Sequence, residues 1–70
     1  MINVTENDKK FIEKEIPNGV ALLSSGDLEG LKDEFSEILG SAEGLGEDGW
    51  PTPYGEKVDD VYMRVLEMNR

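Results

Sequence analysis

The side chains in this sequence that could do chemistry are nearly all carboxylates, because 16 of its 70 residues are Asp or Glu and none is Cys or His. The chain therefore has no thiolate or imidazole nucleophile, no Cys/His zinc site and no disulfide framework. Carboxylates alone leave two chemistries open, acid–base catalysis by a close pair and the binding of a divalent cation. Their spacing decides whether either is feasible.

The spacing of the carboxylates fits neither chemistry. The adjacent pairs Asp33-Glu34 and Asp59-Asp60 fall in segments with helical periodicity, where neighbouring side chains point about 100° apart and do not share a proton. In the acid-rich residues 43–56, Gly49 could be the sixth position of a calcium loop, but that register puts glycines at the first and third positions, which should carry ligands. We therefore expect no catalytic residue, no metal site and no bound cofactor, and we interpret the protein as noncatalytic.

A serine-containing segment offers one alternative. Residues 24–28 (Ser-Ser-Gly-Asp-Leu) are similar in composition to the serine-acid-leucine neighbourhood of acyl carrier proteins, which are also small, acidic and helical. Those proteins carry Asp-Ser-Leu with the serine at the start of a helix, whereas here a glycine and an aspartate follow Ser25. The resemblance implies a carrier or accessory subunit of an enzyme, with Ser25 as the attachment point.

The acidic excess is concentrated in half of the sequence. The whole chain has a net charge of −9, and residues 26–60 alone carry −9, since the segments before and after them carry −1 and +1. Such a segment repels the phosphates of nucleic acid, so we expect no direct nucleic-acid binding. It attracts a basic protein, as in inhibitors, immunity proteins and DNA mimics that present a charged decoy surface. Solubility is the competing explanation. The eleven acids of this segment are Asp27, Glu29, Asp33, Glu34, Glu37, Glu43, Glu47, Asp48, Glu56, Asp59 and Asp60.

Five residues are our candidates for contact with a basic protein partner. Glu29, Asp33 and Glu37 recur every four residues, so they line the face of a predicted helix opposite its apolar residues. Trp50 precedes the last predicted helix, and we expect it to pack back onto the helical core; the alternative is an anchor that faces the partner. Met63 falls on the polar face of the last helix, with a leucine on its flank.

Capping residues and helical periodicity predict three helices. The first spans residues 5–16, with Thr5 as its cap and a Pro-Asn-Gly breaker after it. The second spans residues 28–39 behind a cap at Asp27, and the third runs from Thr52-Pro53 to about residue 68. Apolar residues at helical spacing are Leu28, Leu31, Phe35, Ile38 and Leu39 in the second helix, and Tyr54, Val58, Val61, Val65 and Met68 in the third. On the first helix, Glu6–Lys10 and Lys9–Glu13 are expected ion pairs.

Residues 19–25 are ambiguous. They form either a short helix capped by Asn18 and ended by Gly26, or the second strand of a β-hairpin over residues 9–24. We favour the helix, because its alanine and leucines prefer that conformation. In a helix-breaking loop, the change Gly19→Ala should cost less than about 1 kcal/mol.

These elements predict a small all-α domain over residues 1–70, with three or four short helices and a flexible connector at residues 41–51. An α+β domain with the N-terminal hairpin is the alternative. No apolar run approaches the ~18 residues of a membrane span, and residues 1–5 lack the features of a signal peptide. We therefore expect a cytoplasmic protein with no membrane contact. Amphipathic helices that complete their core in a homodimer are a further alternative.

Overall fold

The computed structural model of the chain describes residues 2–70, and over that range it contains four helices and no β-strand. They are α1 (Glu6–Glu15), α2 (Gly19–Ser25), α3 (Leu28–Leu39) and α4 (Pro53–Met68). The prediction of an all-α fold with three or four short helices is confirmed. The alternative hairpin over residues 9–24 is wrong, because both of its strands are helical.

Three helices begin at the predicted capping side chains. In each, a side-chain oxygen accepts a hydrogen bond from the backbone amide three residues on, which satisfies one of the free donors of the first turn. These bonds join Asp8 N to Thr5 Oγ1 (3.1 Å), Gly30 N to Asp27 Oδ1 (2.9 Å) and Gly55 N to Thr52 Oγ1 (3.0 Å).

The start of α2 differs from the prediction. Asn18 occupies the N-cap position in the left-handed conformation (φ 59°), and its side chain makes no capping hydrogen bond. A Cβ atom on Gly19 would overlap the carbonyl of Ile12, because the first turn of α2 packs directly on the backbone of α1. The expectation that Gly19→Ala is well tolerated is therefore wrong. Close approach, and not a positive φ, requires the glycine.

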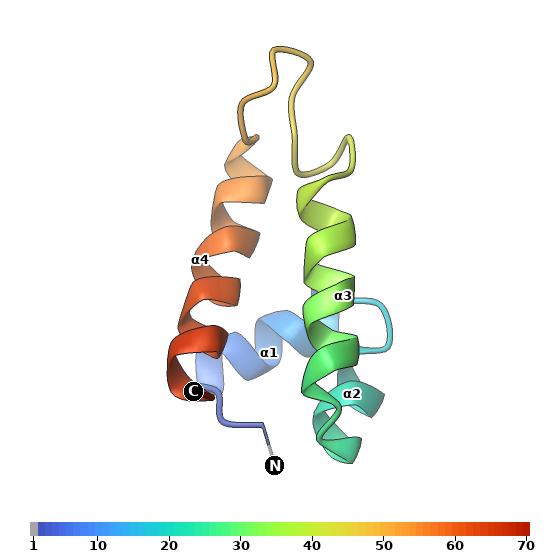
Figure 1. The fold of residues 1–70 in the computed structure, drawn as a ribbon, viewed down its shortest axis with the longest axis vertical. Coiled ribbons are helices and arrows are strands. Elements are labelled where there is room, and N and C mark those ends of the chain that lie inside the picture. Colours follow the sequence, from blue (N-terminus) through green and yellow to red (C-terminus); the bar gives the residue numbers. More distant parts are fainter. Residues whose placement is uncertain (1) are drawn as a thin grey trace.

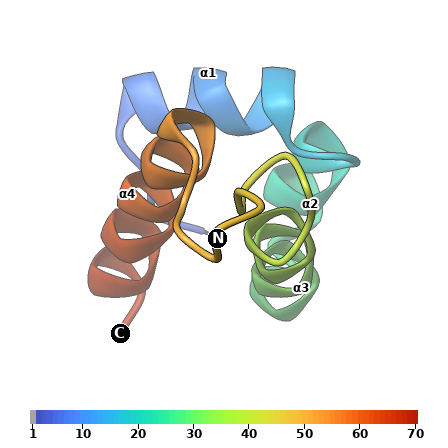
Figure 2. The same ribbon diagram turned by 90° about the horizontal axis from the view of Figure 1, so that it is seen from above.

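The helices are arranged around the α3–α4 pair. These two helices run antiparallel along the long axis of the molecule (Figure 1). The view from above shows α1 lying across one face of this pair, while α2 packs beside α3 (Figure 2). No helix covers the opposite face of the pair within residues 2–70.

The core lies between α1, α3 and α4. Phe35 is fully buried and stacks on the half-buried Tyr62, with ring centroids 5.1 Å apart. Two residues differ from the prediction. Met68 is 42% exposed, so the apolar stripe of α4 ends one turn earlier, and Ile2 is buried although no periodicity marks it. The buried apolar residues are Ile2, Ile12, Ile16, Leu31, Phe35, Val58, Val61 and Val65.

The connector between α3 and α4, which we predict to be flexible, contains hydrogen bonds of its own. Gly46 N donates to Trp50 O (2.8 Å), and Thr52 N donates to Gly44 O (3.1 Å). These bonds fold residues 44–52 into a tight loop. A Cβ atom on Gly55 would overlap the carbonyl of Gly44, so the loop also packs closely against the first turn of α4.

Candidate functional site

The acidic segment of residues 26–60 is open to solvent and is scarcely neutralised by the protein. Ten of its eleven acidic residues are exposed, and Glu34 is half-buried. Residues 2–70 contain three ion pairs, of which only Lys32–Glu29 (3.4 Å) involves this segment. The charge of this segment is therefore available to a partner.

The predicted acidic face lies on α3. Glu29, Asp33 and Glu37 are all exposed, whereas Leu31 and Phe35 on the same helix are fully buried against α4. Glu29 and Asp33 are like charges at i,i+4, as are Asp33 and Glu37. Each such pair destabilises a helix by roughly 0.2–0.5 kcal/mol.

Trp50 does not pack on the helical core, which corrects our expectation. Trp50 is 72% exposed. It belongs to the loop that projects beyond the ends of α3 and α4 (Figure 1). Its backbone amide donates to Asp48 Oδ1 (3.1 Å), which helps to hold the loop. The neighbouring Glu47 and Asp48 are exposed as well, so the tip presents one aromatic ring beside two carboxylates.

Met63 is 55% exposed and lines a groove between α3 and α4. The groove has a volume of about 350 Å³, and Leu28 and Leu66 line it together with Met63. Lys32 also lines this groove and pairs with Glu29. The structure therefore brings Met63 and one end of the acidic α3 face to a single surface, while Trp50 lies apart from them at the tip.

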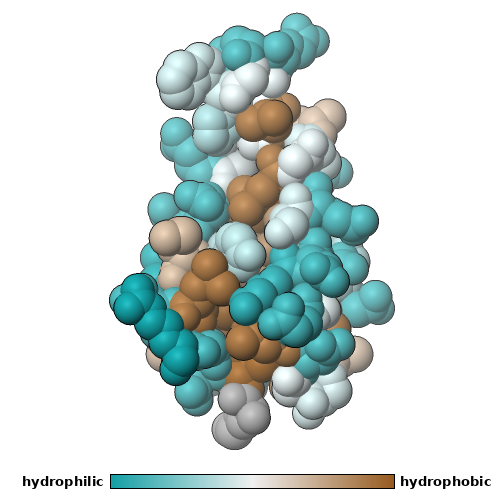
Figure 3. Space-filling view, in the orientation of Figure 1, coloured by the Kyte–Doolittle hydropathy of each residue, from teal (hydrophilic) through white to brown (hydrophobic). Residues whose placement is uncertain are grey.

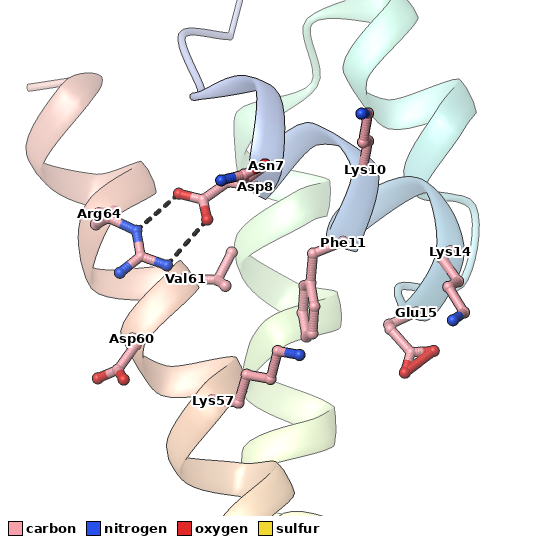
Figure 4. Close-up of a pocket in the computed structure, with 10 residues that line it drawn as sticks. All are labelled: Asn7, Asp8, Lys10, Phe11, Lys14, Glu15, Lys57, Asp60, Val61 and Arg64. Atoms are coloured by element: carbon pink, nitrogen blue, oxygen red, sulfur yellow. Dashed lines mark hydrogen bonds and ion pairs between the residues drawn. The ribbon is translucent and has the colours of Figure 1, made fainter.

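Sequence reasoning missed an ion pair that joins α1 to α4. Arg64 Nε donates to Asp8 Oδ2 (2.8 Å), and Arg64 Nη2 donates to Asp8 Oδ1 (2.9 Å) (Figure 4). The pair is therefore bidentate, a geometry that is typical of guanidinium and carboxylate groups. The hydrogen bond from Arg64 lowers the pKa of Asp8, although burial opposes that shift. The same contact raises the pKa of Arg64. The predicted pairs within α1 do not form, since the three ion pairs of residues 2–70 do not include them.

This ion pair lies at one end of a second groove, of about 400 Å³, between α1 and α4. Lys57 of α4 places its ammonium group 5.5 Å from the ring centroid of Phe11 on α1, a cation–π contact (Figure 4). Elsewhere on α4, burial raises the pKa of Tyr54, and the carboxylates of Glu15 and Glu43 raise it further. These contacts hold α1 on the α3–α4 pair.

The remaining chemical alternatives find no site in the geometry. Within residues 2–70, no three Asp or Glu side chains converge closely enough to hold a metal ion. Ser25 is the last residue of α2, where its hydroxyl donates to Leu22 O (3.3 Å). The serine of an acyl carrier protein starts a helix, whereas Ser25 ends one.

Comparisons with known proteins found no family model that matches this chain, no similar curated protein and no similar solved structure. No helix within residues 2–70 is both long and apolar enough to cross a membrane.

Proposed function

We propose that this protein is a noncatalytic acidic module that binds a basic protein partner and modulates its activity. One observation carries the proposal: ten of the eleven acids in residues 26–60 are exposed, and within residues 2–70 only Glu29 among the eleven has a cationic partner within 4 Å. Stacked like charges such as Glu29, Asp33 and Glu37 oppose folding of an isolated chain. A cationic partner would convert that repulsion into binding energy.

In this proposal, charge and apolar contacts have separate roles. The acidic surface raises the rate of encounter and selects basic partners, an effect that weakens as salt screens the charges. Exposed apolar residues, Met63 and Trp50 foremost, slow dissociation once the complex has formed. The proposal places the protein in the cytoplasm, bound to a protein and not to nucleic acid or membrane.

The test compares two triple variants with the same change in charge. Glu29→Gln/Asp33→Asn/Glu37→Gln neutralises the α3 face, and Glu6→Gln/Glu13→Gln/Glu15→Gln neutralises α1 as a control. Each immobilised protein is exposed to host lysate at low salt, and the bound proteins are eluted with a salt gradient. We expect the wild type and the α1 control to retain the same basic protein, and the α3 variant to lose it. Equal retention by both triple variants would contradict the proposal.

A further inference from the structure

The face of the α3–α4 pair that points away from α1 is an unpartnered helix face with an apolar centre. α1 lies across the other face (Figure 2). The space-filling view shows a band of hydrophobic side chains running down the uncovered face between α4 and α3 (Figure 3). A helix docked there would occupy the position opposite α1.

The side chains of this groove suit a helix. Leu28 from α3 faces Met63 and Leu66 from α4 across the groove. The unbranched thioether of Met63 can adjust its shape to different apolar side chains.

The charged residues that line the groove are Lys32, Glu67 and Arg70, and exposed acids lie beside this lining. Its two cations are already engaged, because Lys32 pairs with Glu29 on α3 and Arg70 pairs with Glu67 at the end of α4. Asp33 lies one turn beyond Glu29, and Asp59 lies one turn before Met63. Both are exposed and make no ion pair within residues 2–70.

We infer that this groove binds an amphipathic helix of the basic partner, an inference that rests on the proposed function. In α4 and just after it, the residues that line the groove run from Met63 to Arg70, a length of about 12 Å, which matches about two turns of a docked helix. Apolar residues at i, i+3, i+4 and i+7 of that helix enter the groove, and lysines or arginines beside them meet Asp33 and Asp59. A second copy of this chain fits poorly, because a two-fold contact would bring together two molecules that each carry a net charge of −9.

The probe is a pair of 14-residue peptides made only of leucine and lysine. One has leucines at helical spacing, and the other has the same composition in an order that destroys that spacing. Each is titrated into the 15N-labelled protein at low salt and followed by NMR. We expect the amphipathic peptide to bind about tenfold more tightly than its scrambled form, because only it can bury its leucines in a groove. Amide shifts should change at Leu28, Met63 and Leu66, and not at Phe11 or Lys57.

Two substitutions with equal starting exposure make the test specific. Met63 and Val20 are each 55% exposed, but Val20 lies on α2, away from the groove. Met63→Gln should weaken binding of the amphipathic peptide about fivefold, since it removes half-exposed apolar surface from the contact. Val20→Gln should leave the affinity unchanged. Circular dichroism verifies that both variants keep the fold.

The outcomes separate this inference from the proposed function. Equal affinity for the two peptides, with shift changes only along Glu29, Asp33 and Glu37, would overturn the groove and leave the acidic surface standing. An unchanged affinity in Met63→Gln would also overturn the groove alone. Failure of both peptides to bind at low salt would overturn both proposals. Shifts at Met63 that change with the concentration of the protein by itself would show a second copy in the groove, and would overturn the inference as stated.

Discussion

Removing Asp8 and removing Arg64 should destabilise the protein by different amounts, although the two residues form one ion pair. The Asp8 side chain is 5% exposed, whereas the Arg64 side chain is 53% exposed. In the variant Arg64→Met, the carboxylate stays buried and loses both charge-assisted hydrogen bonds. In Asp8→Asn, the guanidinium can turn toward water and the amide oxygen can still accept one bond. We therefore expect removal of the arginine to be the more damaging change.

The magnitudes follow from the same geometry. Removing one partner of a fully buried pair costs about 3–5 kcal/mol. The loss for Arg64→Met should be smaller than this, because half of the Arg64 side chain is exposed, but larger than the loss for Asp8→Asn. For Asp8→Asn we expect about 1–2 kcal/mol. A chain of this length has a free energy of unfolding of about 3–10 kcal/mol, so a loss of this kind should lower the urea midpoint of the first variant measurably. Replacing both residues by apolar ones, as in Asp8→Leu/Arg64→Met, should recover most of the loss.

The pH dependence of the free energy of unfolding tests the contribution of this ion pair independently. The pKa of Asp8 is lower in the folded protein than its ordinary value of 3.8. Its contribution to stability is therefore complete at neutral pH, and it is lost as the pH falls below about 4 toward the lowered folded value. In Arg64→Met the buried carboxylate has no partner, so the pKa of Asp8 should rise and protonation should relieve the penalty.

Urea unfolding followed by circular dichroism, at pH 7 and pH 3, measures these differences. The gap in unfolding free energy between the wild type and Arg64→Met should be large at pH 7 and should shrink at pH 3. Equal losses below about 0.5 kcal/mol in both single variants would refute the reasoning, since such values are typical of a surface ion pair. A gap that widens in acid would refute it as well.

Three further predictions concern the core, the α1–α2 contact and the tip. Phe35→Ala should lower the free energy of unfolding by about 3–5 kcal/mol because Phe35 is fully buried, and Glu37→Ala should be nearly neutral; thermal melts of the two variants would contradict the fold if Glu37→Ala were the worse. Gly19→Ala should lower the free energy of unfolding by about 1–3 kcal/mol, because a Cβ there overlaps the Ile12 carbonyl. A urea midpoint equal to that of the wild type would mean that α1 and α2 separate easily. Compared with free tryptophan, the fluorescence of Trp50, the single tryptophan, should be quenched more strongly by caesium and less strongly by iodide, since the exposed Glu47 and Asp48 are close to it in the chain; the opposite changes would show that the tip is not anionic.

Local signals predicted most of this fold. Thr5, Asp27 and Thr52 cap their helices as expected, because a capping bond depends on residues only three positions apart. The periodicity of α3 also placed Leu31 and Phe35 in the core. Interactions within one or two helical turns can be inferred from spacing, and those were the successful predictions.

Long-range contacts could not be predicted in this way. Asp8 and Arg64 are 56 positions apart, and nothing in the local pattern marks which of 16 acids pairs with which of seven cations. The requirement for glycine at Gly19 and Gly55 arises from backbone approach between separate elements. The exposure of Trp50 depends on the hydrogen bonds that fold its loop away from the helices. Each of these features becomes visible only when the helices have been placed in space.

Among the functional candidates, exposure on one helix face was predictable, but the groove was not. The four-residue spacing of Glu29, Asp33 and Glu37 is enough to place them on the exposed side of α3. The sequence places Met63 on the polar face of its helix with only Leu66 on its flank. Its neighbour across the groove, Leu28, lies on a different helix, so their proximity depends on how α3 and α4 pack.

The association rate constant of the captured basic partner tests the central claim most directly. Surface plasmon resonance at low and high salt would compare the wild type, the α3 triple variant and the α1 triple variant. We predict that the α3 variant associates more slowly at low salt and loses most of its salt dependence, while its dissociation rate changes little and the α1 variant resembles the wild type. Identical association rates for the wild type and the α3 variant at low salt would mean that the acidic face serves solubility alone, and would contradict the proposed function.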